Sequence, residues 1–510
     1  MLKCDVLVVG AGGAGLVSAI KAHENGSKVV VITKEYPTRS QTCMAQGGIN
    51  AAFGNAGDDS VEAHIQNTLK SAHGLADEKA IRFLCENAKE AVEWLDSLGV
   101  CFSRTQDAKI AQRTLGGASA SRACYAQDYT GLKILHTLYD VCLGLGIEIL
   151  NERYLLDFCV DANMICGANI LNIRSGEQEY YSAKSVIVAT GGYSRIYSKY
   201  STNSTATTGD GIASAIRAGA KVSDMEFVQF HPTALKNSSI LISESARGAG
   251  GLLLNSKNKR FVDELLPRDE VARAINDEIS KGEEIFLDIR HLGENFIDTQ
   301  LPQERKLAKL YENIDPVYDL IPIKPVAHYT MGGIEVDDNT MTNIKGLFAV
   351  GECANHRVHG ANRLGGNSLL ELIVFGKQAG KSASKFALGV DAQRICKEQV
   401  SLEIFFKKPS FDFYKIKEQL ASSFYENVGI SRDGDGLQKV FDEVEVYKSQ
   451  LADMGVEDNS KIYNTNLVEF LEFKNMLELA SLVLNSAMQR KESRGSHFRT
   501  DFPQENGVKK

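Results

Sequence analysis

A glycine-rich turn between two apolar runs is the feature that most limits how this chain can fold. The run Cys4–Val9 leads into the turn Gly10–Gly15 (GAGGAG), a helical pattern covers Leu16–Glu24, and a second apolar run covers Lys28–Thr33. This order predicts a β-α-β unit that binds a dinucleotide. In the G-x-G-x-x-G spacing, the first glycine permits the tight turn, the second lets the backbone approach a pyrophosphate, and the third lets helix pack on strand. The phosphates are expected at the helix N-terminus, which favours negative charge.

Two later apolar runs also end in glycine. Ser185–Ala189 precedes Thr190-Gly191, and Gly346–Val350 precedes Gly351. Runs of this kind, far apart in the sequence, indicate one parallel sheet with inserted segments. We therefore predict an α/β fold in three parts: a Rossmann-like dinucleotide-binding domain at residues 1–229 and 334–388, a second domain inserted at 230–333, and a C-terminal helical domain at 389–510.

Helical periodicity is clearest near the C-terminus. Leu467, Phe470, Leu471, Lys474, Leu477 and Leu484 are spaced to lie near one face of a helix. A capping box at Asn466 and Glu469 is expected to begin this helix, and Gly495 to end it.

Composition excludes several classes of partner and site. The net charge of −8, without a basic run, argues against nucleic acid. The ten cysteines form no CxxC pair, so we expect no iron–sulfur cluster and no metal site, and reduced thiols in the cytoplasm. We see no signal peptide and no apolar run of the roughly 18 residues that a membrane helix needs. If the protein lies at the inner face of a membrane, we expect a partner subunit to attach it there.

The end of the second predicted strand bears on which dinucleotide is bound. The strand ends in Thr33-Lys34, where a dinucleotide enzyme often has an acid for the ribose, and Glu35 comes one or two positions late. NAD is therefore not the expected cofactor.

A series of short motifs follows the glycine turn in a characteristic order. They are Arg39–Gly48, Gln112–Gly117, Thr208–Gly211, Gln229–Thr233, Ser243–Arg247, Pro267–Asp269, His328–Gly333, Gly351–Cys353, His359–Leu369 and Lys491–Gly495. This ordered set resembles the succinate dehydrogenase/fumarate reductase flavoprotein family, part of the FAD-dependent oxidoreductase 2 superfamily. The resemblance covers residues 1 to about 500. It implies electron transport in anaerobic respiration and an α+β capping domain in the inserted segment.

The resemblance also implies FAD as the cofactor of a Rossmann-like FAD-binding domain. The residues that match the family's flavin contacts are Gly10, Ala11, Gly12, Gly13, Ala14, Gly15, Thr33, Lys34, Ser40, Gln41, Thr42, Ala45, Gln46, Gly47, Gly48, Thr190, Gly191, Asp210, Glu352, Ser368 and Leu369.

Gln41 departs from the family pattern. Respiratory members attach FAD covalently through a histidine here, and an amide nitrogen is no nucleophile for that bond, so we expect FAD to be held non-covalently. In the family, loss of this bond is associated with a lower flavin potential, which favours fumarate reduction. L-Aspartate oxidases, which make iminoaspartate for NAD biosynthesis, also lack this histidine and are the alternative.

The substrate implied by the resemblance is a small dicarboxylate. Its two carboxylates need cationic groups and hydrogen-bond donors from two sides, and the planar fork of arginine matches a carboxylate. Arg363 is expected to bind one carboxylate, with His231, Ser243 and His328 as further donors.

Arg268 matches the family's proton donor, and Glu244 and Arg247 match the relay that resupplies it. The implied reaction is hydride transfer from flavin N5 to one alkene carbon of fumarate, with a proton from Arg268 to the other, giving succinate. Arginine normally keeps its proton, so transfer requires burial and crowding by other cations. The inserted domain is expected to close as a lid over the flavin.

Two alternative functions can each be judged by one feature of the sequence. Aspartate oxidases place a glutamate before the paired glycines to meet the substrate ammonium, whereas this chain has Leu115 there, which favours fumarate. A flavin-binding assembly protein without activity is the other class, and retention of the two arginines and two histidines argues against it.

The electron partner stays open. Respiratory members usually continue well beyond Lys491–Gly495, with segments that contact the iron–sulfur subunit, and here only Ser496–Lys510 follow. We expect an iron–sulfur or other electron-transfer subunit, with a thiol-oxidising subunit and a soluble donor as alternatives.

Overall fold

The computed structural model describes residues 2–390 and 400–507, so Cys396 and the last residues of the predicted C-terminal domain lie outside the described residues. The helices are α1 (Gly13–Glu24), α2 (Val61–Ser71), α3 (Glu78–Glu86), α4 (Ala88–Ser97), α5 (Thr130–Gly144), α6 (Asp210–Arg217), α7 (Glu244–Gly248), α8 (Arg268–Ser280), α9 (Glu294–Gln300), α10 (Pro302–Glu312), α11 (Asn367–Leu388), α12 (Phe413–Asn427), α13 (Gly434–Gln450) and α14 (Thr465–Gln489). The strands are β1 (Leu2–Val9), β2 (Val29–Ile32), β3 (Ile49–Asn50), β4 (Gln112–Arg113), β5 (Ala123–Cys124), β6 (Glu148–Leu150), β7 (Arg153–Asp161), β8 (Met164–Asn172), β9 (Gln178–Val188), β10 (Val222–Ser223), β11 (Val228–Leu235), β12 (Leu252–Asn255), β13 (Ile285–Asp288), β14 (Ile321–Thr330), β15 (Gly333–Glu335), β16 (Leu347–Ala349) and β17 (Ala354–Asn355).

The main sheet runs in the order β6-β2-β1-β9-β8-β7, and β16 also pairs with β9. The pairs β6–β2, β2–β1, β1–β9 and β9–β16 are parallel, whereas β7 and β8 form antiparallel pairs. The predicted parallel sheet built from distant runs is therefore confirmed. On one face the apolar side chains of β1 pack with those of α1, α5 and α11, and on the other they pack with β7, β8 and α14. Burial on both faces explains why β1 and β2 read as continuous apolar runs.

The glycine turn holds β1 and α1 against each other. A Cβ atom on Gly15 would lie 2.0 Å from the carbonyl oxygen of Gly10, and one on Gly10 would lie 2.2 Å from that of Ala189. Gly10 also has a φ of +109°, a conformation that favours glycine. Only glycine therefore allows the turn, the helix and β9 to come together in this way.

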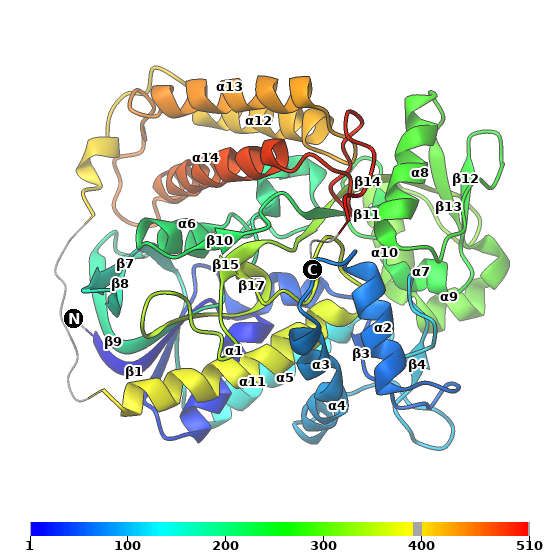
Figure 1. The fold of residues 1–510 in the computed structure, drawn as a ribbon, viewed down its shortest axis with the longest axis horizontal. Coiled ribbons are helices and arrows are strands. Elements are labelled where there is room, and N and C mark those ends of the chain that lie inside the picture. Colours follow the sequence, from blue (N-terminus) through cyan, green and yellow to red (C-terminus); the bar gives the residue numbers. More distant parts are fainter. Residues whose placement is uncertain (1, 391–399, 508–510) are drawn as a thin grey trace.

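The inserted segment builds a second sheet in the order β11-β14-β13-β12, with every pair antiparallel. Its own apolar core includes Leu253, Val271 and Ile285, and α7 to α10 surround it on the right of Figure 1. This arrangement matches the expected α+β character of the segment. The sheet spans Val228–Thr330, so the expected limit at 230 falls inside β11, and the limits of the domain stay a prediction.

The C-terminal helices α12, α13 and α14 lie together along the upper side of Figure 1, opposite α1 and α11. Side chains of α12 to α14 share one apolar core with β7, β8 and β9. Two details of the predicted last helix were wrong. Its N-cap is Asn464, whose side chain accepts the N–H of Leu467, and the helix ends at Gln489 rather than near Gly495. The helix is also buried on most sides, since it passes between α6 and α13.

Candidate active site

One deep cavity lies at the carboxyl ends of β1, β2, β9 and β16, the edge at which sheets of this type bind ligands. Every predicted cofactor residue except Gly15 lines it, and so do His231, Ser243, Glu244, Arg268, His328 and Arg363. Gly15 contributes by packing, as described above. Arg247 also stays outside the lining, because it lies behind Glu244. The fold therefore brings predicted cofactor and substrate residues from segments as far apart as Gly10 and Leu369 into one space.

The cofactor part of the cavity fits FAD. Helix α1 begins at Gly13, and its N-cap Gly12 has no side chain to cap it; the N–H of Gly13 donates to Oγ1 of Thr42 at 3.0 Å, and the next N–H groups of the first turn are left for a phosphate. The Oγ of Ser40 and the Oε1 of Gln46 are buried without a hydrogen-bond partner among the described residues. Such atoms are costly unless a ligand or water completes them.

Lys34 lies where a dinucleotide enzyme often has an acid for the ribose, and its side chain contacts two carboxylates. Its Nζ donates to Asp210 at 2.6 Å, to Glu472 at 2.5 Å and to Thr208 at 2.8 Å. Burial by itself would lower the pKa of Lys34, but the two carboxylates raise it overall. Asn475 joins the network by donating to Asp210 at 2.9 Å. Sequence analysis missed Glu472 and Asn475, because they lie on α14, far from every cofactor motif.

Gln41 borders the cavity at the position of the expected histidine. Its Oε1 accepts the N–H of Ser204 at 2.6 Å, so the side chain ties the Arg39–Gly48 loop to the segment before α6. Glu352, also predicted as a flavin contact, accepts the N–H of Thr330 at 3.0 Å. Burial raises the pKa of Glu352 to about 7, so its carboxyl group exchanges a proton near neutral pH.

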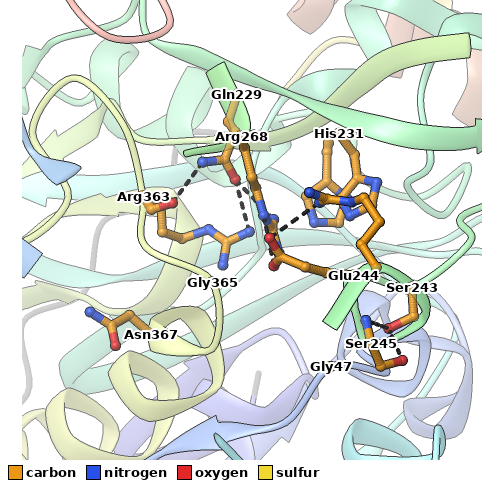
Figure 2. A network of polar contacts seen from close by, with 12 residues as sticks. Gly47, Gln229, His231, Ser243, Glu244, Ser245, Arg268, Arg363, Gly365 and Asn367 are labelled. Carbon is orange, nitrogen blue, oxygen red and sulfur yellow. Dashed lines mark hydrogen bonds and ion pairs between the residues drawn. The ribbon is translucent and has the colours of Figure 1, made fainter. Parts of the chain in front are cut away.

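Arg268 and Glu244 meet at the substrate end of the cavity (Figure 2). Nε and Nη2 of Arg268 donate to one oxygen of Glu244 at 3.1 and 2.6 Å, and Nη2 of Arg247 donates to the other at 3.2 Å. Burial alone would raise the pKa of Glu244, but these two cations lower it overall. The predicted donor and its relay are thus in direct contact.

Gln229 connects the two arginines that border the substrate space. Its Oε1 accepts from Nη1 of Arg268 and from Nη2 of Arg363, each at 3.0 Å, and its Nε2 donates to the carbonyl of Arg363 (Figure 2). The same Nε2 also donates to Oδ1 of Asn362. Sequence analysis gave this residue no role, although it opens the Gln229–Thr233 motif. The amide holds both guanidinium groups without neutralising either.

Arg363 is buried and has donor capacity left. Its guanidinium lies 4.4 Å from the centre of the Tyr329 ring, and its Nε has no hydrogen-bond partner among the described residues. Burial, followed by repulsion from Arg268, lowers the pKa of Arg363 to about 10. The group still carries its charge at neutral pH, so it can receive a carboxylate.

His231 and His328 lie side by side, with ring centres 4.9 Å apart. Burial, and then the nearby Arg268, lowers the pKa of both well below the usual range, so both rings are neutral. Nδ1 of His231 accepts the N–H of Thr233 at 3.2 Å, which leaves the proton on Nε2. His231 is therefore a neutral hydrogen-bond donor rather than a cation.

Ser243 caps α7, because its Oγ accepts from the N–H of Ser245 at 3.1 Å. Leu115 borders the cavity and is buried, with no charge to offer an ammonium group. Among residues 2–390 and 400–507 no cluster of histidine, cysteine and acidic side chains could hold a metal ion. The same residues contain no helix that is both long and apolar enough to span a bilayer.

Comparisons with known proteins agree with this geometry. Residues 5–369 match the model for the FAD binding domain, and residues 417–509 match that for the fumarate reductase flavoprotein C-terminus. The chain is 37% identical to the fumarate reductase flavoprotein subunit of Haemophilus influenzae, over 99% of this chain and 90% of that protein. It is 38% identical to the succinate dehydrogenase flavoprotein subunit of Rickettsia conorii, over 99% and 91%. A solved structure of a FrdA mutant of E. coli quinol fumarate reductase matches with a TM-score of 0.93 at 35% identity, covering 100% of this chain and 94% of that one.

Proposed function

The chain belongs to the fumarate reductase/succinate dehydrogenase flavoprotein family and is a FAD-dependent oxidoreductase of CH–CH groups, and we propose that it mainly reduces fumarate to succinate. The observation that carries the dicarboxylate chemistry is the contact of Arg268 and Arg363 with one amide oxygen of Gln229, beside the cofactor residues of the cavity. FAD, when bound, would supply the hydride. The side chains bind and orient the dicarboxylate and deliver the proton.

Two ends of the substrate would be held by different groups. Arg363 would bind one carboxylate through its free donor, and His231, His328 and Ser243 would donate to the other. Neutral histidines suit this role, because they add hydrogen bonds without a further charge that must be buried. Holding both ends would align the alkene and exclude water.

Arg268 would deliver the proton to the substrate carbon, and Glu244 and Arg247 would resupply it. Arginine rarely gives up its proton. Here Arg268 is buried, and its Nη2 lies 2.6 Å from an oxygen of Glu244, the group that would return a proton to it. The same charge would stabilise the electron density that develops on the substrate.

The preference for fumarate reduction and the non-covalent binding of FAD both rest on Gln41. Its amide cannot form the histidine bond, and its contact with Ser204 keeps it in place as a structural residue. We also propose that a separate subunit delivers electrons, because the curated relatives are named as flavoprotein subunits.

The proposal is tested with the purified FAD-containing chain and a reduced viologen dye. We expect fumarate-dependent dye oxidation to be faster than succinate oxidation with an artificial acceptor. Little L-aspartate oxidation is expected, because Leu115 cannot pair with an ammonium group. Iminoaspartate formation at a rate similar to fumarate reduction would show that the enzyme is an aspartate oxidase instead.

A further inference from the structure

Two acidic side chains are fully buried where the inserted segment meets the FAD-binding part, outside the cavity lining. Asp128 lies just before α5, Glu304 lies in the first turn of α10, and both are 0% exposed. One oxygen of each, Asp128 Oδ1 and Glu304 Oε2, has no hydrogen-bond partner among the residues that the structure describes. A buried carboxyl oxygen without a donor is costly, so this acid pair requires an explanation.

The other oxygen of each carboxyl group joins separate parts of the fold. Asp128 Oδ2 accepts the N–H groups of Gln303 at 2.7 Å and Glu304 at 3.3 Å. These groups lie in the first turn of α10, where N–H groups have no acceptor within the helix. Glu304 Oε1 accepts the N–H of Ser243 at 3.1 Å. Ser243 caps α7, and the first residue of α7 is Glu244, which holds Arg268. Contacts therefore run from the loop before α5, through α10, to the proton-delivery residues.

The surroundings disfavour two charges on the acid pair. Burial, followed by repulsion from Asp128, raises the pKa of Glu304 well above its usual range, and burial raises the pKa of Asp128 to about 6. The other titratable neighbours are Arg113, on β4, and Tyr129, beside Asp128. Arg113 gives its hydrogen bonds to three main-chain carbonyls and makes none to the pair.

We propose that Asp128 and Glu304 share one proton between their unpartnered oxygens, and that Glu304 is thereby a positioning residue that fixes Ser243 and the start of α7 for the reaction. A single proton would satisfy both oxygens at once, because one carboxyl donates to the other. The remaining negative charge stays opposite the N-terminus of α10, where it is favoured. The inference rests on the proposed function, since it assigns a role in placing Glu244 and Arg268.

Loss of the shared proton would leave two buried negative charges whose facing oxygens have no hydrogen-bond partner among the described residues. The pair would separate, and α10 would no longer hold Ser243 in place. Activity should therefore fall as the pH rises beyond the range in which the pair keeps its proton. The stability of the fold should also fall as the pH rises. Carboxyl groups with a raised pKa in the folded state stabilise that state most at low pH, and this contribution is lost at higher pH.

The test compares Glu304→Gln with Glu304→Leu in the FAD-containing chain. Glutamine keeps an acceptor for Ser243 and offers Asp128 an N–H that does not titrate. We expect its alkaline fall in kcat to move to higher pH or to disappear, and its Tm advantage over wild type to be larger at pH 8 than at pH 5. Leucine removes the acceptor, so kcat should drop about ten- to a hundredfold, as expected for a misplaced catalytic group, and KM should rise because Ser243 also holds a substrate carboxylate.

Glu312→Gln, at the other end of α10, is the matched control and should leave the pH profile unchanged. An infrared band of a protonated carboxyl group should be present in wild type and absent in Glu304→Gln. Identical pH profiles and melting curves for Glu304→Gln and wild type would overturn the inference, even if Glu304→Leu does not fold. Failure of the wild-type chain to reduce fumarate would instead count against the proposed function alone.

Discussion

At the scale of single residues, the substrate end of the cavity depends on one neutral side chain placed between two charged ones. Gln229 is neutral and lies between two cations, Arg268 and Arg363, and its one oxygen accepts from both. A carboxylate at this position would compete with the substrate for the same guanidinium groups. Glu244 supplies the negative charge only on the far side of Arg268, where a relay needs it. The two arginines can therefore have different roles despite their common partner.

Substitution of the two arginines should separate these roles. Arg363→Ala should raise the dissociation constant of fumarate about ten- to a hundredfold, since a hydrogen bond to a charged group contributes roughly 1.5–3 kcal/mol. Arg268→Lys keeps the charge but loses the planar fork, so turnover should fall by at least the roughly 10²–10⁴-fold typical of a positioned acid. Flavin oxidation by saturating fumarate, followed in a stopped-flow instrument, distinguishes the two effects. Near-normal turnover in Arg268→Lys would remove it as the proton donor, provided that FAD content is unchanged.

At the scale of elements, α14 supports two lining residues of the cofactor part of the cavity, Lys34 and Asp210, from outside the Rossmann-like unit. Glu472 and Asn475 lie one turn apart on α14 and reach Lys34 at the end of β2 and Asp210 at the start of α6. Burial raises the pKa of Glu472, although Lys34 opposes this, so the carboxylate depends on its lysine partner. The helix thus contributes polar contacts to the site as well as apolar packing.

Removal of the Glu472 carboxylate should therefore cost more than removal of a surface acid on the same helix. We expect Glu472→Leu to lower the free energy of unfolding by roughly 1.5–3 kcal/mol, as for a lost hydrogen bond to a charged group, and to weaken FAD binding. Glu478→Leu is the matched control, because its carboxylate pairs with the more exposed Arg217 and should contribute about 0–1 kcal/mol. Denaturant unfolding with and without added FAD measures both effects. Equal losses in the two variants would argue against a role for α14 in the cofactor site.

At the scale of the whole molecule, the cofactor site forms where segments that are far apart in the sequence come together. The cavity takes residues from the glycine turn, the Arg39–Gly48 loop, the start of α6 and the start of α11. Figure 1 shows how far these segments are spread along the colour scale, from blue to yellow. Enclosure by the folded chain, rather than a bond at residue 41, is what would retain FAD.

Unfolding of the whole chain should therefore release the cofactor. We expect the purified protein to be yellow, and its FAD to pass through a filter after acid or heat denaturation. The native protein should retain the flavin on the same filter. A fluorescent flavin band at the mass of the polypeptide in a denaturing gel would contradict non-covalent binding.

Much of the fold could be predicted because its signals are local. The β-α-β unit follows from Gly10–Gly15 and the flanking apolar runs, and the parallel sheet from two later runs that end in glycine. Predictions at the ends of elements were weaker. Asn466 was expected to begin the last helix, whereas Asn464 does, because both residues have an amide side chain that can cap and only the folded backbone selects one.

The sequence by itself determined the dinucleotide turn, many of the residues that border the cavity, and the absence of the histidine at position 41. Each depends on a residue type and on its near neighbours in the chain. Only the tertiary structure decided the bridge through Gln229, the contact of Glu472 with Lys34, and the burial of Asp128 beside Glu304. These interactions join residues from tens to several hundred positions apart, and their energies depend on burial and on the exact partner. No local pattern carries that information, because the same side chain would be solvated and unremarkable on an exposed surface.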